Sequence, residues 1–135
     1  MKTVLVTGSS SGLGKSIIEK YASMGYNTII TYNNNMDAAE KLNSYIKEKY
    51  KVNSEFYKLD ITDEENINSL VTSLKKEYSN IDVLVNNAGI ALDNLYTNKS
   101  KSEFLKVVTT NLVGTFLVTK AFSSWMYECK THYLP

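Results

Sequence analysis

Residues 6–14 of the chain read VTGSSSGLG, a loop rich in glycine and serine that joins two apolar runs. The run before it, Val4–Thr7, is short and β-branched, which is typical of a strand. The run after it has apolar residues at helical spacing and reaches Gly25, a residue that commonly ends a helix. The sequence therefore predicts a strand, a loop and a helix in succession.

The glycines of this loop have separate predicted roles. Gly8 lets the chain turn sharply after the strand, Gly12 lets the backbone come close to a ligand, and Gly14 lets the helix pack tightly on the sheet. Free N–H groups and a partial positive charge at the helix N-terminus favour a pyrophosphate. Hydroxyl donors are added by Ser9, Ser10 and Ser11. The alternative is a flexible turn without a ligand, and the flanking strand and helix favour the nucleotide.

Strand and helix patterns alternate along the rest of the chain. The expected strands are residues 4–7, 27–32, 54–59 and 81–85, and the composition of the last predicts burial on both faces. Helices are expected between them, and a long helix is expected to run to about Met126. This alternation predicts an α/β fold with parallel strands and right-handed crossovers.

Polar sequences mark the starts of three expected helices. Asn33-Asn34-Asn35 forms a turn into the second helix. Thr62-Asp63-Glu64-Glu65 and Ser100-Lys101-Ser102-Glu103 have the form of capping boxes, which predicts helix starts at Thr62 and Ser100.

Four motifs resemble those of the short-chain dehydrogenase/reductase family. They are Thr-Gly-x-x-x-Gly-x-Gly at 7–14, LDITD at 59–63, NNAG at 86–89 and TTNLVGTF at 109–116, and they match in type, order and spacing. The resemblance runs from Met1 to about Phe122 and is closest to the 3-oxoacyl-acyl-carrier-protein reductase group. It implies a Rossmann-type doubly wound parallel sheet that ends, in this chain, after the fourth strand and its following helix.

The resemblance also implies a site for a nicotinamide dinucleotide. In that site Asp60 bonds the adenine, the Ile61 backbone flanks it, and Asn86 ties strands together; the alternative for Asp60 is an aspartate at a helix start. No metal ligands are implied. The implied cofactor contacts are Gly8, Ser9, Ser10, Ser11, Gly12, Leu13, Gly14, Tyr32, Asn33, Asp60, Ile61, Asn87, Ala88 and Gly89.

The end of the second strand bears on the choice between NAD and NADP. An acidic residue there would bond the ribose 2′-OH and select NAD, but Thr31-Tyr32-Asn33 carries no acid. No arginine or lysine attracts a 2′-phosphate either, since Ser11 stands where many NADP-using relatives have a basic residue. The expected cofactor is NADP, with NAD as the alternative.

The family's reaction is hydride transfer between nicotinamide and a carbonyl group. It uses a tyrosine as proton donor, a lysine four residues later that lowers the tyrosine pKa, and a serine that polarises the substrate oxygen. The resemblance places these groups on a fifth strand and its following helix, which the 135 residues do not include. Tyr45 and Lys49 have the spacing but precede the third strand, so we interpret them as a coincidence on a surface helix.

Asn111 is the implied catalytic residue of this chain. It lies in mid-helix, where asparagine is unfavourable, and the resemblance implies that it binds a water of the proton relay; the alternative is an asparagine that faces solvent. We expect the 135-residue chain to bind the cofactor without catalysis. The parent enzyme would reduce a small carbonyl compound or an acyl thioester.

The composition changes toward the C-terminal end, where the only Trp, Cys, His and Pro residues lie. We expect residues 1–126 to form an incomplete NAD(P)-binding domain and residues 127–135 to be foreign to the family, through a frameshift or a premature stop. The residues that mark the change are Trp125, Cys129, His132 and Pro135.

Composition limits the partners and the compartment. A net charge of +1 gives no electrostatic reason to expect nucleic acid or an anionic membrane. A single cysteine excludes an internal disulfide framework, so a reducing cytoplasm is expected. No apolar run approaches the ~18 residues that span a bilayer.

The long helix predicts self-association. By family topology the strand order is 3-2-1-4, which leaves the fourth strand at an edge, and unpaired apolar edges recruit other chains. In relatives this helix contributes to a dimer interface, so a homo-oligomer is expected. The alternative function is a non-catalytic interaction module that uses this helix. Its apolar residues are Phe104, Leu105, Val108, Leu112, Val113, Phe116, Leu117, Phe122 and Met126.

Overall fold

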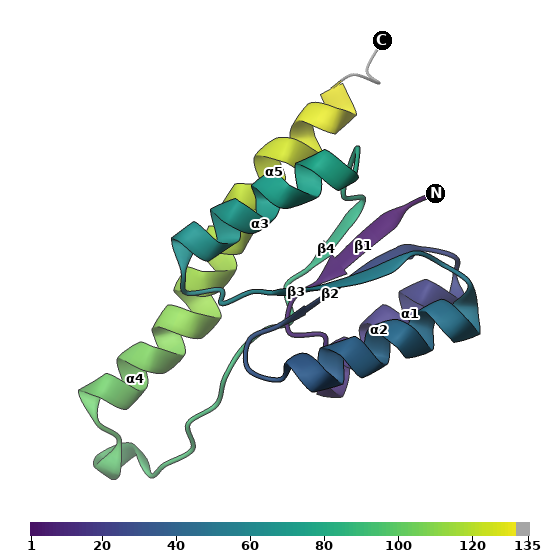
Figure 1. Ribbon diagram of the computed structural model, residues 1–135. Helices are drawn as coiled ribbons and strands as arrows, with labels where there is room; N and C mark the ends of the chain where they lie inside the picture. Colours follow the sequence, from purple (N-terminus) through teal and green to yellow (C-terminus); the bar gives the residue numbers. More distant parts are fainter. Residues whose placement is uncertain (132–135) are drawn as a thin grey trace.

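Among residues 1–131, which the structure describes, four parallel strands form one sheet in the order β3-β2-β1-β4 (Figure 1). The structure is a computed structural model, with side chains described to Glu128. The strand order and the Rossmann-type α/β class are those that the motifs imply. In chain order the elements are β1 (Thr3–Val6), α1 (Gly12–Ser23), β2 (Asn27–Tyr32), α2 (Met36–Tyr50), β3 (Ser54–Lys58), α3 (Glu64–Glu77), β4 (Val83–Val85), a 3-10 turn (Tyr96–Asn98), α4 (Lys101–Val108), a π-helical segment (Thr109–Gly114) and α5 (Thr115–Thr131).

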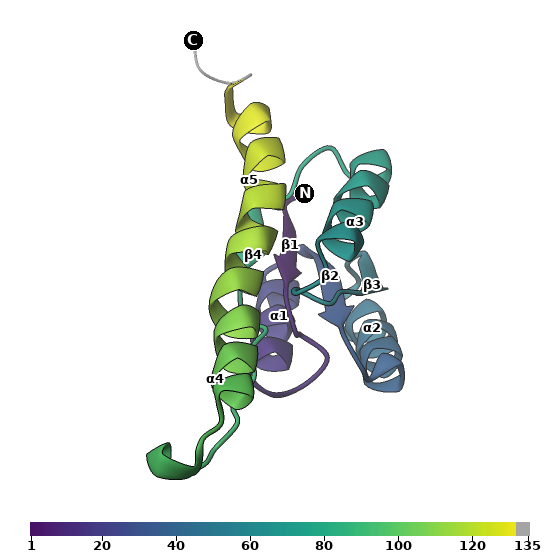
Figure 2. The same cartoon turned by 90° about the vertical axis from the view of Figure 1, so that its left-hand side faces the viewer.

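Alternate residues of the strands build two cores on opposite faces of the sheet. Leu5 and Ile29 face α3 and α5, whereas Val4, Val6 and Ile30 face α1 and α2. Figure 2 shows these two helical layers with the sheet between them. Since the strands carry apolar residues toward both faces, neither face of the sheet can be left to water. The carboxyl ends of the strands thus emerge between two rigid layers.

The fourth strand differs from its prediction. It covers only Val83–Val85, and its residues are half-buried, because β4 lies at the edge of the sheet in this chain. Ile81 is buried outside the strand. The Asp82 carboxylate accepts a hydrogen bond from the backbone N–H of Thr3 at 2.7 Å. The predicted burial of residues 81–85 on both faces is therefore wrong.

Side-chain caps begin three of the helices. Asn35 accepts from the N–H of Ala38 at 3.0 Å, and Ser100 accepts from the N–H of Glu103 at 3.1 Å. The start predicted at Thr62 is wrong, because the cap of α3 is Asp63. The Thr62 hydroxyl instead donates to the Asp60 carboxylate at 2.6 Å.

The long helix is continuous from Lys101 to Thr131 but changes its winding at Thr109–Gly114. It extends past Met126, the predicted end, because residues 127–131 contain neither glycine nor proline. His132 and Pro135, which mark the expected foreign tail, lie outside the described residues. No helix within residues 1–131 combines the length and the apolar character needed to cross a membrane.

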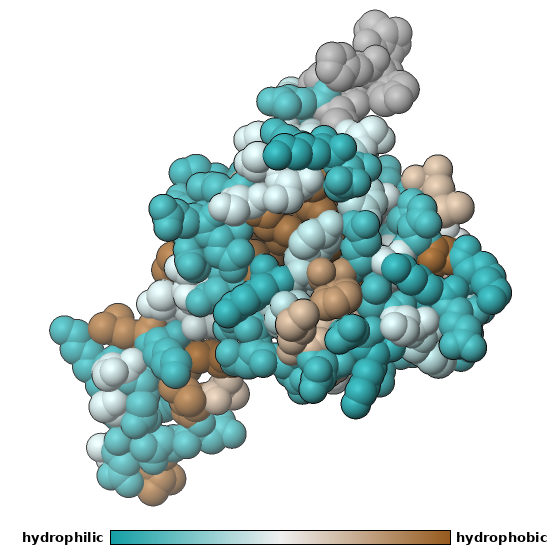
Figure 3. Space-filling model, viewed as in Figure 1, coloured by the Kyte–Doolittle hydropathy of each residue, from teal (hydrophilic) through white to brown (hydrophobic). Residues whose placement is uncertain are grey.

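Apolar side chains remain exposed along this helix and the 3-10 turn before it. Figure 3 shows brown side chains on the lobe that these elements form, at the lower left of the view. Phe122 and Trp125 on α5 are buried, so most of the exposed apolar side chains lie in the earlier part of the helix, and Tyr127 near its end is also exposed. The other exposed residues are Leu95, Tyr96, Phe104, Leu105, Leu112, Val113 and Phe116.

Candidate functional site

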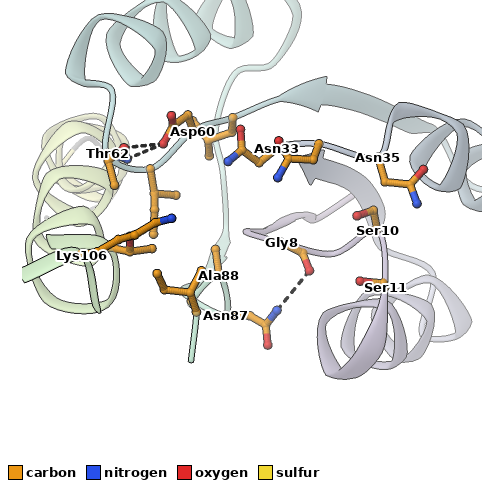
Figure 4. A pocket seen from close by; sticks show the side chains of 16 residues that line it. Gly8, Ser10, Ser11, Asn33, Asn35, Asp60, Thr62, Asn87, Ala88 and Lys106 are labelled. Carbon is orange, nitrogen blue, oxygen red and sulfur yellow. Dashed lines mark hydrogen bonds between the residues drawn. The ribbon is translucent and has the colours of Figure 1, made fainter. Parts of the chain in front are cut away.

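A cavity of about 650 Å³ opens at the carboxyl ends of the strands (Figure 4). Its size is within the range of ligand sites. Nine of the residues implied as cofactor contacts line it, namely Gly8, Ser10, Ser11, Asn33, Asp60, Ile61, Asn87, Ala88 and Gly89. Seven further lining residues were not anticipated, namely Asn34, Asn35, Leu59, Thr62, Ile90, Lys106 and Thr110.

The glycine loop takes the conformation that its predicted roles require. Gly8 has φ +63° and Gly12 has φ +57°, in the left-handed region that favours glycine. A Cβ at Gly8 would lie 3.0 Å from the Cα of Ala88, whereas one at Gly12 would meet nothing within 4 Å. Gly12 therefore presents open backbone outward, and Gly8 allows the loop to pass close to the chain after β4.

The N-terminus of α1 is uncapped. Ser11 occupies the cap position with extended backbone, but its side chain makes no capping hydrogen bond. The first turn of α1 carries no acidic residue, in contrast to α2, α3 and α4, each of which has both a side-chain cap and an acidic residue there. The first N–H groups of α1 are thus left to solvent or to an anion.

Ser9 does not offer its hydroxyl to this cavity, so the prediction of three hydroxyl donors is wrong for this residue. Its side chain is fully buried, donates to the carbonyl oxygen of Val6 at 2.8 Å and accepts from the N–H of Thr31 at 3.1 Å. The hydroxyl of Ser9 therefore both donates and accepts a hydrogen bond within the protein. Ser10 and Ser11 remain at the cavity wall (Figure 4).

Asn87 joins the glycine loop to the chain after β4. Its amide donates to the carbonyl oxygens of Thr7 and Gly8 at 3.1 and 3.2 Å. A Cβ on Gly14 would overlap both that amide and the Gly8 carbonyl oxygen, so the tight packing predicted for Gly14 is against the loop. The tie between strands was predicted at Asn86, but Asn86 donates to the Thr119 hydroxyl of α5 at 3.0 Å.

Asp60 lies at one end of the cavity and is held by local contacts. Its Oδ1 accepts from the N–H of Thr62 at 2.9 Å and from the Thr62 hydroxyl. Its own N–H donates to the side chain of Asn66 at 2.7 Å. Oδ2 accepts no hydrogen bond from the described residues and remains available. Asp60 thus shapes the turn before α3, as in the alternative interpretation, and keeps one oxygen for a ligand.

Asn111 lies within the π-helical segment, and its side chain is bonded to the other end of the cavity. Its amide donates to the Ile90 carbonyl oxygen and accepts from the Ile90 N–H, both at 2.8 Å. A Cβ on Gly89 would come within 3.0 Å of the Asn111 Oδ1. Single π turns often occur at functional sites. The side chain anchors the loop 89–90, which neither of the two interpretations from sequence anticipated.

Gly114 anchors the same segment to the opposite end of the cavity. A Cβ on Gly114 would lie 2.8 Å from Cγ1 of Ile61 and 3.0 Å from its carbonyl oxygen. The segment Thr109–Gly114 therefore contacts the loop at Ile61 through Gly114 and the loop at Ile90 through Asn111.

Four implied contacts besides Ser9 do not line the cavity. Leu13 is 71% exposed on α1, and Tyr32 packs against Phe56 with ring centroids 6.2 Å apart; neither lines the cavity. Gly12 and Gly14 act through the backbone of the loop.

Lys106 lines the cavity from α4 near Asp60 and Thr62 (Figure 4). Lys106 lies one helical turn before Thr110, so the two lining residues share one side of the helix.

Tyr45 and Lys49, which have the spacing of the family's catalytic pair, lie away from the cavity. The Lys49 ammonium donates to the Tyr45 hydroxyl at 2.7 Å on the exposed face of α2. Hydrogen bonding of the ammonium group to Tyr45 first, and then to Tyr50, raises the pKa of Lys49. The interpretation of this pair as a surface feature agrees with its position. Within residues 1–128 no three histidine, cysteine, aspartate or glutamate side chains are grouped to hold a metal.

Comparisons with known proteins agree with this geometry. The family model for short chain dehydrogenase matches residues 2–132. The 3-oxoacyl-acyl-carrier-protein reductase of Aquifex aeolicus is 40% identical over 119 residues, which is 88% of this chain and 48% of that protein. The NADP-dependent 3-hydroxy acid dehydrogenase of Schizosaccharomyces pombe is 35% identical over 128 residues, or 94% of this chain and 49% of that protein.

A solved structure gives the same result. The alcohol dehydrogenase of Thermococcus sibiricus, complexed with 5-hydroxy-NADP, superposes with a TM-score of 0.89 at 26% identity, covering 96% of this chain and 55% of that one. The chain spans about half the length of the curated relatives that it matches. With the fold, the motifs and the family model in agreement, the chain belongs to the short-chain dehydrogenase family of oxidoreductases.

Proposed function

We propose that this chain binds a nicotinamide dinucleotide, NADP(H) in preference to NAD(H), in the cavity at the carboxyl ends of its strands. The observation that carries the proposal is the uncapped start of α1, which opens on a cavity of about 650 Å³. The starts of α2, α3 and α4 are capped by Asn35, Asp63 and Ser100. A pyrophosphate at α1 would accept from N–H groups that otherwise have no partner in the protein.

The two ends of the cavity give the dinucleotide a direction. The adenine lies at Asp60, whose free Oδ2 and flanking Ile61 backbone provide polar and apolar contacts. The nicotinamide lies toward Gly89 and Ile90, beside Asn111. When bound, the dinucleotide supplies or accepts a hydride at that end. The residues of this chain bind and orient it there.

The substrate of the whole protein is proposed from its relatives. We infer a carbonyl compound that is reduced, or the corresponding alcohol that is oxidised, with a 3-oxoacyl thioester as the favoured class, because a 3-oxoacyl-acyl-carrier-protein reductase is among the most similar relatives. Within residues 1–128, whose side chains the structure describes, no serine and Tyr-x-x-x-Lys set lies near Asn111. We therefore propose that this polypeptide alone binds the dinucleotide without reducing carbonyls.

The absence of an acidic side chain at the end of β2 supports NADP(H). Asn33 and Asn34 line the cavity where an acidic residue would repel a 2′-phosphate. The relative from Schizosaccharomyces pombe is named as NADP-dependent, and the structure from Thermococcus sibiricus contains an NADP derivative.

Calorimetric titration of the chain with NADPH and with NADH tests the proposal. Saturable binding of NADPH, tighter than that of NADH, is expected. The variant Gly14→Ala should lose both, since its Cβ overlaps the Asn87 amide and the Gly8 carbonyl oxygen. The matched control is Lys20→Ala, an exposed residue near the far end of α1 that does not line the cavity. If the wild-type chain binds neither nucleotide, the proposal is wrong and the interaction-module alternative gains support.

We also propose that a second copy of the chain covers the exposed apolar side chains of α4 and the π-helical segment. Phe104, Leu112 and Phe116 are 57%, 67% and 60% exposed. Exposed apolar patches on soluble proteins commonly mark interfaces. The edge strand β4 lies beside α5, the continuation of this helix (Figure 2), which favours pairing with a like surface.

A further inference from the structure

A second hollow adjoins the candidate cofactor site. It has a volume of about 450 Å³ and lies between α1 and α2. Ser10 of the glycine loop lines both this hollow and the main cavity, so the two are neighbours at that residue. The side chains that line it besides Ser10 are Lys15, Glu19, Ala38, Lys41, Leu42 and Tyr45.

The hollow is lined by two lysines whose positive charges are not neutralised by an ion pair with the described residues. Lys15 comes from the first turn of α1 and Lys41 from the second turn of α2, and both are exposed. Among the described residues neither ammonium group is paired with a carboxylate. Glu19, one turn after Lys15, is the one acidic residue of the lining and leaves a formal excess of one positive charge.

We propose that Lys15 and Lys41 bind the 2′-phosphate of NADP(H) in this hollow. The inference rests on the proposed function and adds the residues that select the cofactor. With the pyrophosphate on α1 and the adenine at Asp60, the ribose that joins them lies near Ser10 and Asn33, which line the same side of the cavity (Figure 4). A phosphate on that ribose then meets Ser10 and the mouth of the hollow.

The chemistry of the lining suits a compact dianion. Each lysine presents three donors on a flexible stem, and the Ser10 hydroxyl adds a further donor. The 2′-phosphate would receive its positive partners from the two helices rather than from the loop after β2, where Asn33 and Asn34 are neutral. Lys41 would thus take the role of the basic residue that is missing at Ser11, because the fold places α2 beside the glycine loop.

The test compares 2′,5′-ADP with 5′-AMP, which differ by the 2′-phosphate and carry no nicotinamide. In calorimetric titrations we expect Lys41→Gln and Lys15→Gln each to weaken 2′,5′-ADP binding by about three- to tenfold, and to leave 5′-AMP binding unchanged. Glu19→Gln should act in the opposite direction, since it removes the one carboxylate of the lining. Lys20→Gln on α1 and Lys47→Gln on α2 are the matched controls, because neither residue lines the hollow.

The outcomes separate this inference from the proposed function. If both lysine variants bind 2′,5′-ADP as tightly as the wild type, the inference is overturned while the cofactor site stands. The inference is also overturned, and the cofactor site again stands, if the wild type binds 2′,5′-ADP and 5′-AMP equally tightly. If the wild type binds neither, the proposed function fails first. A decline in the advantage of 2′,5′-ADP as salt is raised would support the ionic contact, because salt screens exposed charges.

Discussion

Ser9 and Thr31 are joined by two hydrogen bonds between the glycine loop and the last residues of β2. The N–H of Ser9 donates to the Thr31 carbonyl oxygen at 3.0 Å, and the N–H of Thr31 donates to the Ser9 Oγ at 3.1 Å. The Thr31 hydroxyl in turn accepts from the N–H of Gly8 at 3.1 Å. The loop that would hold a pyrophosphate is therefore fixed to the neighbouring strand before any ligand arrives.

Replacing Ser9 with alanine should destabilise the protein. The substitution leaves the buried N–H of Thr31 without its acceptor, which costs about 1–3 kcal/mol in the free energy of unfolding. Urea denaturation measures the change. Ser10→Ala, at the cavity wall, is the control and should change the free energy by no more than about 0.5 kcal/mol. Equal stability of the two variants would contradict the structural role of Ser9.

Asn111→Asp should loosen the loop at Ile90 while keeping the shape of the side chain. The carboxylate can still accept from the Ile90 N–H, but its second oxygen then faces the Ile90 carbonyl oxygen at the present donor distance of 2.8 Å. Two acceptors in contact repel, so hydrogen exchange at Gly89 and Ile90 should become faster. Thr110→Ser, at the neighbouring position, should leave exchange there unchanged. An unaltered exchange rate in Asn111→Asp would show that the amide does not anchor the loop.

A carboxylate between two phenols predicts a loss of stability in alkali. Glu55 accepts from the hydroxyls of Tyr57 and Tyr78 at 2.6 and 2.9 Å. Burial first, and then the Glu55 carboxylate, raise the pKa of both tyrosines above the usual value of 10.0. The unfolded chain thus releases these protons at lower pH than the folded chain, so the stabilisation is complete below pH 10 and declines as the pH rises further.

Thermal unfolding of the wild type and of Tyr78→Phe at several pH values checks this effect. The melting temperature of the wild type should fall more steeply above pH 10 than that of the variant, because the variant has one fewer shifted phenol. Lysine deprotonation affects both proteins alike and cancels in the comparison. Parallel curves for the two proteins would mean that Tyr78 titrates as freely in the folded chain as in the unfolded one.

Sedimentation tests the proposed self-association. At micromolar concentration the wild type should sediment as a dimer or a larger species, because water contact with Phe104 and Phe116 is removed when a second copy covers them. The variant Phe104→Ser/Phe116→Ser should shift toward the monomer. Leu13→Ser, an equally exposed apolar residue on α1, is the control and should sediment as the wild type does. A compact wild-type monomer would refute the proposal.

Local patterns predicted most of the fold. The strand at Asn27–Tyr32 and the cap at Ser100 follow from neighbouring residues alone, and the structure has them as predicted. The turn predicted at Asn33-Asn34-Asn35 also leads into α2, with Asn35 as its cap. Where two adjacent residues could both cap a helix, the sequence alone did not show which of them does so. Asp63 caps α3 although Thr62 has the better motif, because Thr62 is already bonded to Asp60.

The same limit explains what was missed at the candidate site. Asn86 and Asn87 are neighbours of the same type, and only the fold decides that Asn87 reaches Thr7 while Asn86 reaches Thr119. Lys106 comes to the cavity from a helix more than forty residues after Asp60. The π-helical winding at Thr109–Gly114 leaves no mark in the apolar pattern, although Asn111 and Gly114 are unfavourable in an ordinary helix.

The number of residues in this π-helical segment affects both the contact of Asn111 with Ile90 and the packing of α5 on the core. A π turn takes up one residue more than an α-turn, and each residue of an α-helix rotates the chain by about 100°. Deleting one residue within Thr109–Gly114 would restore regular winding and turn everything on one side of it by that angle. If α5 kept its place over the sheet, Asn111 would leave Ile90; if Asn111 kept its place, Val118 and Trp125 would turn out of the core. The segment fixes how α5 is rotated about its axis relative to Asn111. Its residue count must therefore satisfy both the contact at the cavity and the packing of the core.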